Sequence, residues 1–176
     1  MLEVWDDWSE WKKLRWSIKR EFRKQELKFA PSDHRYDNVL LIWLRFKFNS
    51  YSNEYLRKQL SLNEVCGDEP NLFPCPCCGF KTIDERAEYE ICPVCWWEDD
   101  GQDNQNADIS MGGPNEDISL TQARINYLKF GIYNPKLTDL IEKKSDTSKY
   151  IKGRTFQFNE SGVIVEIGSN WKSSDK

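Results

Sequence analysis

Residues 73–101 read FPCPCCGFKTIDERAEYEICPVCWWEDDG, and this stretch decides how the chain folds. It holds two C-x2-C pairs, Cys75 with Cys78 and Cys92 with Cys95, and thirteen residues separate the pairs. A C-x2-C turn directs two thiolates at one point, so two facing turns make a tetrahedral four-sulfur site for an ion such as Zn²⁺. The spacing is close to the pattern of known zinc sites. The sequence therefore predicts a small zinc-ribbon-like module with these four cysteines as ligands.

A site with four protein ligands is closed, so the prediction is a structural zinc. Iron is the alternative metal, in a rubredoxin-like centre, because the same tetrahedral thiolates suit both ions. Cys77 lies between two ligands, and it is either a small residue that shapes the turn or a reactive thiol. Cys66 is expected to be a small packing residue. Trp96 and Trp97 are expected to shield the sulfurs from water.

Several motifs resemble the bacterial cysteine-rich CPCC family. They are CPCCG at 75–79, YEICPVC at 89–95 and WEDDG at 97–101, and the likeness continues through GPN at 113–115 to NYLKFG at 126–131. The resemblance covers about residues 72–131 and implies a small metal-binding module. It also implies a likeness to immunity-type proteins that are encoded near bacterial toxins.

The charge of the chain is distributed unevenly. Residues 66–119 hold thirteen Asp and Glu and only Lys81 and Arg86, a net charge of −11, whereas residues 1–65 carry +3 and residues 120–176 carry +4. An acidic middle repels phosphate backbones, so nucleic acid is not expected as a partner. A basic protein is the expected partner. The residues expected to contact it are Glu98, Asp99, Asp100 and Asp103.

The chain contains no recognisable set of nucleophile, base and orienting group, so we do not expect an enzyme. The leading hypothesis is a zinc-stapled acidic binding protein, an immunity-type inhibitor of a basic bacterial toxin. One alternative is a hydrolase in which acids of residues 98–108 hold a divalent cation. These acids do not fit the calcium-loop motif in register, and a solvated acidic loop is the simpler interpretation. The other alternative is the rubredoxin-like iron protein.

The remaining patterns predict an α+β fold in three parts. Residues 1–65 are a mainly helical N-terminal region, residues 66–132 the zinc module, and residues 133–176 a helix, a β-hairpin and a frayed tail. Apolar residues at three- and four-residue steps predict one helix over 3–29. Residues 33–49 favour a second helix over a buried strand. A third helix is expected to begin at Ser52.

Within the module, residues 81–83 and 87–91 are expected to be the two strands of the ribbon hairpin. A capping box of Ser119 and Gln122 predicts a helix over 120–130 that ends at Gly131. Pro135 opens a further helix, expected to run to about residue 144. Residues 154–158 and 163–167 flank a four-residue turn and predict a β-hairpin.

The sequence also bears on location. The longest apolar run, residues 39–44, is too short to span a bilayer, so no membrane partner is expected. The first residues, MLEVWDDW, lack the basic and apolar regions of a signal peptide. We therefore expect a cytoplasmic protein, in a compartment where thiols stay reduced and able to bind metal.

Overall fold

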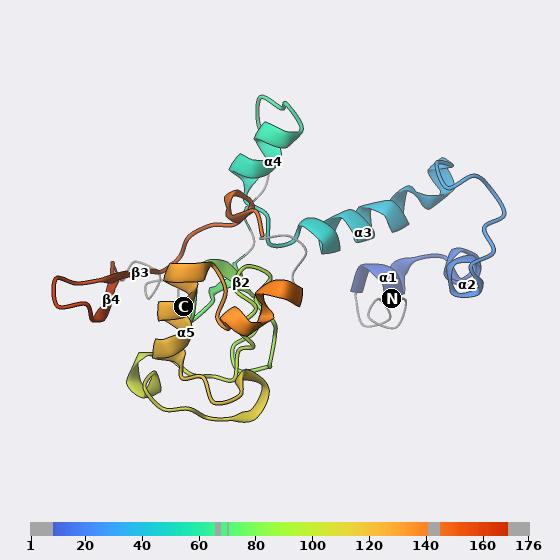
Figure 1. The fold of residues 1–176 in the computed structure, drawn as a ribbon. Coiled ribbons are helices and arrows are strands. Elements are labelled where there is room, and N and C mark those ends of the chain that lie inside the picture. The colour runs from blue at the N-terminus through green and yellow to red at the C-terminus, as the bar shows by residue number, and fades with distance from the viewer. Residues whose placement is uncertain (1–8, 66–67, 70, 141–144, 169–176) are drawn as a thin grey trace. The chain divides into compact units, whose positions relative to one another are not determined.

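The computed structural model describes residues 9–65, 68–69, 71–140 and 145–168. The chain divides into two compact units, Met1–Asn49 and Ser50–Lys176, whose elements are labelled in Figure 1. The predicted division placed its first boundary after residue 65, whereas this division falls after Asn49. Cys66, expected as a packing residue, lies outside the described residues.

The first unit is helical. Its elements are α1 (Ser9–Lys13), α2 (Trp16–Lys24), the 3₁₀ turn η2 (His34–Tyr36) and α3 (Asp37–Phe48). Its core joins Trp11 and Ile18 to the buried side chains of Tyr36, Val39 and Ile42. This core contains no cysteine, and beside its apolar packing the buried Glu21 pairs with Arg35 at 2.7 Å and accepts a hydrogen bond from the Tyr36 hydroxyl.

The single helix predicted over 3–29 is wrong for the described residues, and its residues 3–8 lie outside them. Arg15 has an extended backbone (φ −58°, ψ 135°) and separates α1 from α2. Gln25 takes a left-handed conformation (φ 55°) and ends α2. Periodicity located the apolar face, but nothing in the residue types marked the break at Arg15. Residues 37–48 form α3, which confirms the helix over the strand.

The second unit combines helices with two small antiparallel sheets, which confirms the α+β class. The helices and strands are α4 (Asn53–Gln59), β1 (Phe73–Pro74), β2 (Lys81–Ile83), α5 (Leu120–Phe130), β3 (Thr155–Phe158) and β4 (Ile164–Ile167). Short 3₁₀ turns are η3 (Asn104–Asn106), η4 (Gly113–Asn115), η5 (Pro135–Leu140) and η6 (Thr147–Lys149). As predicted, Ser52 marks the start of α4: it is the N-cap before Asn53, and its Oγ accepts a hydrogen bond from the Tyr55 amide.

The ribbon hairpin predicted between the cysteine pairs is wrong. Residues 81–83 form β2, but β2 pairs with β1, the strand on the other side of the first cysteine pair in the sequence. Ala87 and Tyr89 have positive φ angles of 66° and 59°, which an extended strand does not allow. Ile91 instead pairs with Glu98 across the second cysteine pair. Each pair therefore closes its own small hairpin.

The C-terminal predictions hold with two changes. Ser119 caps α5 by accepting a hydrogen bond from the Gln122 amide, but the Gln122 side chain donates to Asn126 and does not return to the cap. The helix expected after Pro135 is the 3₁₀ turn η5, and residues 141–144 lie outside the described residues. Strands β3 and β4 form the predicted hairpin.

None of the helices in the described parts of the chain is long and apolar enough to cross a membrane.

Candidate metal centre

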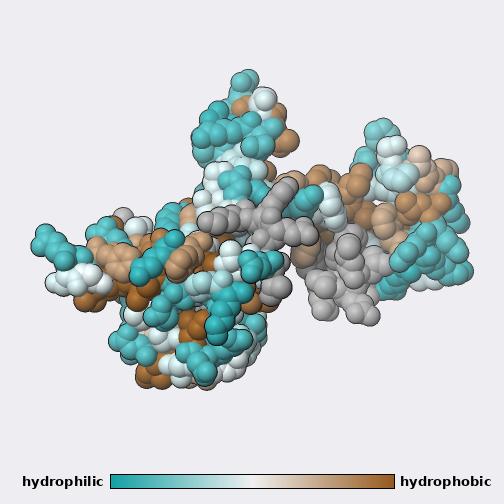
Figure 2. All heavy atoms as spheres, viewed as in Figure 1, coloured by the Kyte–Doolittle hydropathy of each residue, from teal (hydrophilic) through white to brown (hydrophobic). Residues whose placement is uncertain are grey.

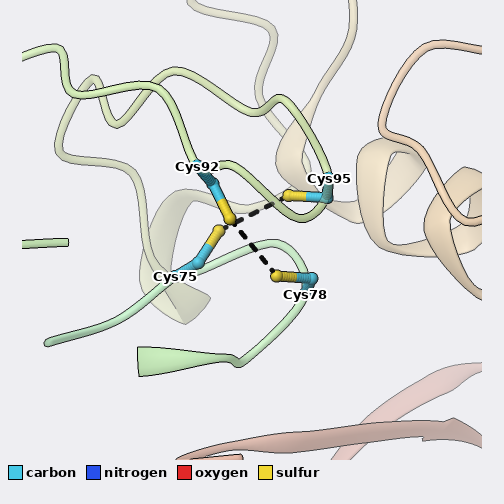
Figure 3. A group of neighbouring side chains, drawn as sticks. All are labelled: Cys75, Cys78, Cys92 and Cys95. Carbon is cyan, nitrogen blue, oxygen red and sulfur yellow. Dashed lines mark hydrogen bonds between the residues drawn. The ribbon is translucent and has the colours of Figure 1, made fainter. Parts of the chain in front are cut away.

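The four predicted ligands come together at one point. The Sγ atoms of Cys75, Cys78, Cys92 and Cys95 all lie within 4.8 Å of one another and are fully buried (Figure 3). Two of the separations, Cys75–Cys95 and Cys78–Cys92, are 3.6 Å. A disulfide needs about 2.05 Å, so the thiols are free. Tetrahedral Zn–S bonds of about 2.3 Å place the sulfurs about 3.8 Å apart. The cluster therefore fits such an ion.

Two backbone turns hold the cysteines, and we call residues 74–81 the first knuckle and residues 91–98 the second knuckle. In the first, the Gly79 amide donates to the Cys75 carbonyl at 2.8 Å. In the second, the Trp96 amide donates to the Cys92 carbonyl at 2.9 Å. Each first cysteine also donates its amide across the hairpin, to the carbonyls of Phe80 and Trp97 respectively. The two knuckles thus share one hydrogen-bond pattern.

The environment disfavours the charged form of three of the four thiols. Burial raises the pKa of Cys75, Cys78 and Cys95. Burial also acts to raise the pKa of Cys92, but hydrogen bonds from the other three cysteines and from Thr82 outweigh it and lower this pKa. Binding a divalent ion would supply the positive charge that four buried thiolates need, with release of protons.

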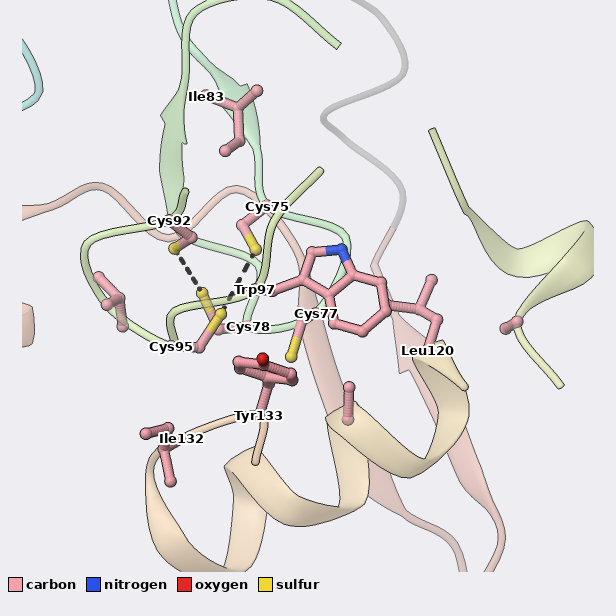
Figure 4. Close-up of a cluster of buried hydrophobic side chains, with 13 residues drawn as sticks. Cys75, Cys77, Cys78, Ile83, Cys92, Cys95, Trp97, Leu120, Ile132 and Tyr133 are labelled. Atoms are coloured by element: carbon pink, nitrogen blue, oxygen red, sulfur yellow. Dashed lines mark hydrogen bonds between the residues drawn. The ribbon is translucent and has the colours of Figure 1, made fainter. Parts of the chain in front are cut away.

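An apolar core encloses the sulfurs. Trp97 is fully buried, and its ring lies between the cysteines and Leu120 (Figure 4). Tyr133 meets Trp97 edge to face, with ring centroids 5.8 Å apart. Trp97 therefore shields the cluster as predicted. Trp96 does not, because 44% of its surface is exposed.

Cys77 lies in this core and is fully buried. It occupies the place in the first knuckle that Val94 occupies in the second. A reactive cysteine needs access to solvent, so its position favours the structural interpretation, a small apolar side chain inside the turn.

A buried ion-pair network surrounds the module. The Arg154 guanidinium is fully buried and donates to both carboxylate oxygens of Asp103, at 2.7 and 3.1 Å, and to Glu166 at 2.9 Å. Burial acts to raise the pKa of Asp103, but the hydrogen bonds and charge of Arg154 outweigh it and lower this pKa. Arg124 lies 4.1 Å above the Phe156 ring and donates to the Pro76 carbonyl, and burial lowers its pKa to about 10.

The acids proposed as partner contacts occupy different environments. Asp99 is fully buried, and Arg86 donates to it at 2.7 Å. Asp103 pairs with Arg154 at 2.7 Å and with Arg86 at 3.3 Å. Asp100 accepts a hydrogen bond from the Asn115 side chain, and Glu98 is half-buried. Arginines thus take up two of the four carboxylates, which leaves the partly exposed Glu98 and Asp100.

The acidic loop of residues 98–108 does not gather into a second metal site. Within the described residues, the four cysteines are the one group of acidic, histidine or cysteine side chains whose ligand atoms converge. The arginines that neutralise the loop were missed by sequence reasoning. Arg154 is 51 residues from Asp103 along the chain, so no local spacing connects them.

The family comparison covers this module. Residues 73–147 match the family model described as Cysteine-rich CPCC. No match to the chain was found among curated proteins or among solved structures.

Proposed function

Since residues 73–147 match the cysteine-rich CPCC family model, we propose that the four cysteines hold a structural zinc and that the chain is an acidic binding protein, an immunity-type inhibitor of a basic toxin. Four convergent thiolates leave no coordination position for a substrate or a water molecule. Their complete burial favours a staple over a reactive centre. The metal would supply folding free energy and hold the knuckles rigid.

Zinc is favoured over iron because a closed four-thiolate site is the usual structural zinc site. Elemental analysis of the purified protein decides between them. We expect one zinc per chain and a colourless protein. A red protein with stoichiometric iron would show that the four cysteines form a rubredoxin-like centre and not a structural zinc site.

The observation that carries the binding function is the placement of the acids. Of the thirteen acids in residues 66–119, eight are exposed: Asp68, Glu69, Asp84, Glu85, Glu88, Asp108, Glu116 and Asp117. The second unit as a whole has a net charge of −7, against +3 for the first. Such a surface attracts a basic protein and speeds its association. A nuclease-type toxin, which needs basic groups for its own substrate, has this chemistry.

A mutational test of this surface should therefore change the exposed carboxylates and not Asp99, which is buried. Glu85→Lys with Glu88→Lys reverses two charges that solvent reaches and that form no ion pair within the described residues. The tagged protein is used to capture proteins from its host at low and at high salt. We expect a basic protein in stoichiometric amount, whose activity the chain inhibits and whose capture the double variant weakens.

The control is Glu160→Lys, an exposed charge reversal outside the acidic segment. It should leave both capture and zinc content unchanged. Capture that is equally strong for the double variant would contradict the acidic-surface function, and so would a captured protein that is not basic.

A further inference from the structure

The two knuckles are equivalent position by position, at an offset of seventeen residues. Cys75 and Cys78 correspond to Cys92 and Cys95, and the facing pair Pro74 with Lys81 corresponds to Ile91 with Glu98. Gly79, with φ 81°, corresponds to Trp96, with φ 70°. The knuckles therefore match in these backbone features, and they differ in their side chains and in what packs on them.

The chain's own C-terminal segment covers the first knuckle. The amides of Gly153 and Arg154 both donate to the Gly79 carbonyl at 2.9 Å. A Cβ atom on Gly153 would lie 2.9 Å from Pro74, so this backbone sits directly on the hairpin. Lys152 donates to the Cys78 carbonyl and lies 4.2 Å from the Phe80 ring centroid. The covering segment, IKGR at 151–154, is basic, and its Lys152 forms an antiparallel bridge with Phe80.

The second knuckle is contacted by Tyr133, whose amide donates to the Cys95 carbonyl at 2.9 Å, but no described segment covers its outer face. Pro74, Pro76 and Gly79 are buried in the first knuckle, whereas Ile91, Pro93 and Trp96 at the equivalent positions are exposed. Ile91 has 58% of its surface exposed, as does nearby Tyr89. Asn115 bonds both backbone groups of Glu98, so part of the hairpin edge is closed and the outer face remains open.

Trp96 is an unfavourable residue for its position. Its left-handed backbone costs a non-glycine residue free energy, and Gly79 shows that glycine serves the same turn. With 44% of the Trp96 surface exposed, burial of the indole offsets only part of that cost. Strained residues that the fold tolerates concentrate at sites of function. Exposed tryptophan in a rigid frame is also the side chain that most often dominates a binding interface.

We propose that the open face of Tyr89, Ile91, Pro93 and Trp96 binds an extended segment of a partner protein that carries Lys or Arg beside apolar side chains. This inference rests on the binding function proposed above and names its contact surface. The basic partner follows from charge, because Glu88 and Glu98 border the face and form no ion pair within the described residues. It also follows from the first knuckle, which the basic segment 151–154 covers. Figure 2 shows apolar and polar side chains intermixed on the visible face of the second unit.

The test uses the zinc-loaded chain and a phage-displayed library of random linear peptides. We expect enriched peptides that combine Lys or Arg with apolar residues. Trp96→Gly should weaken their binding by about thirtyfold, the loss typical of an interface tryptophan. The same variant should keep its zinc and melt at an unchanged or higher temperature, because glycine relieves the left-handed backbone.

Ile91→Ser should also weaken binding. Its matched control is Val163→Ser, since Val163 is β-branched, equally exposed at 58% and lies beside the β3–β4 turn. The inference is overturned if no basic peptide is enriched, if binding ignores Trp96→Gly, or if Trp96→Gly lowers the melting temperature. A basic host protein that binds wild type and Trp96→Gly equally, but not the Glu85→Lys, Glu88→Lys variant, would overturn this face and leave the proposed function standing.

Discussion

The first knuckle and the second knuckle have the same backbone hydrogen bonds, yet they differ in their surroundings. Segment 151–154 and Arg124 cover one, whereas the other presents Ile91 and Trp96 to solvent. The comparison separates two determinants of structure. Both knuckles share the C-P-x-C sequence and the same turn, whereas distant segments determine whether the turn is buried or exposed.

Loss of the metal has the largest expected effect, and it tests whether the knuckles are equal as ligand donors. Structural zinc contributes about 10–16 kcal/mol of apparent binding free energy in small domains. Cys75→Ser and Cys92→Ser should therefore each release zinc and unfold the second unit, to the same degree. Zinc content and the dispersion of amide NMR signals measure this.

The control for both is Cys77→Val, which copies the residue of the second knuckle. It should retain one zinc per chain, because Cys77 is a core side chain. Zinc retention by only one of the two serine variants would show that the knuckles are not equivalent, and zinc loss from Cys77→Val would make Cys77 a ligand.

Arg154→Met tests the network behind the cover of the first knuckle. The change removes the buried guanidinium that Asp103 and Glu166 share, a loss of about 3–5 kcal/mol, while Arg86 still contacts Asp103 at 3.3 Å. The folded-state pKa of Asp103 lies below its ordinary value. The contribution of Asp103 to stability is therefore complete above its pKa in the unfolded chain, about pH 4. It is lost as the pH falls through the lower pKa of the folded state. Removing Arg154 should raise this pKa.

Urea unfolding at neutral pH measures the loss, and carboxyl NMR titration measures the pKa. Peptide binding to the second knuckle should survive in the folded fraction. An Asp103 pKa that does not rise would mean that another group holds it, Arg86 being the next cation at 3.3 Å.

Local sequence predicted the parts of this molecule that local chemistry determines. The cysteine spacing identified the four convergent cysteines, Ser119 and Gly131 marked the ends of α5, and the turn at 159–162 marked the last hairpin. It failed where distant residues decide. The acids at Asp99 and Asp103 read as solvated charges because their arginine partners lie 13 and 51 residues away. Trp96 and Trp97 are adjacent and identical, so only the paired hairpin distinguishes the exposed one from the buried one.

Gly79→Ala tests how closely segment 151–154 packs on the first knuckle. An added Cβ would lie 2.1 Å from the Arg154 carbonyl oxygen, in a backbone with φ 81°. The covering segment must then move, and we expect a loss of about 3 kcal/mol from overpacking and strain together. Gly162→Ala is the control, since its φ is 76° and nothing lies within 4 Å of the added atom. It should lose only about 1 kcal/mol. If both variants lost the same free energy of unfolding in urea, segment 151–154 would move away from the first knuckle at little cost.

The proline pair gives the smallest and most direct comparison. Pro76 and Pro93 occupy the same position in their knuckles, but Pro76 is buried beneath Arg124 and Pro93 is exposed. Replacing either by alanine frees the unfolded chain, which lowers stability by about 0.4–1 kcal/mol in both cases. Pro76→Ala also removes buried apolar surface, so it should lose about 1 kcal/mol more. Because the backbone contribution cancels, the difference between the two unfolding free energies measures only the effect of burying Pro76. If the two variants were equally stable, Pro93 would be as buried in solution as Pro76, and the second knuckle would already be covered within the chain.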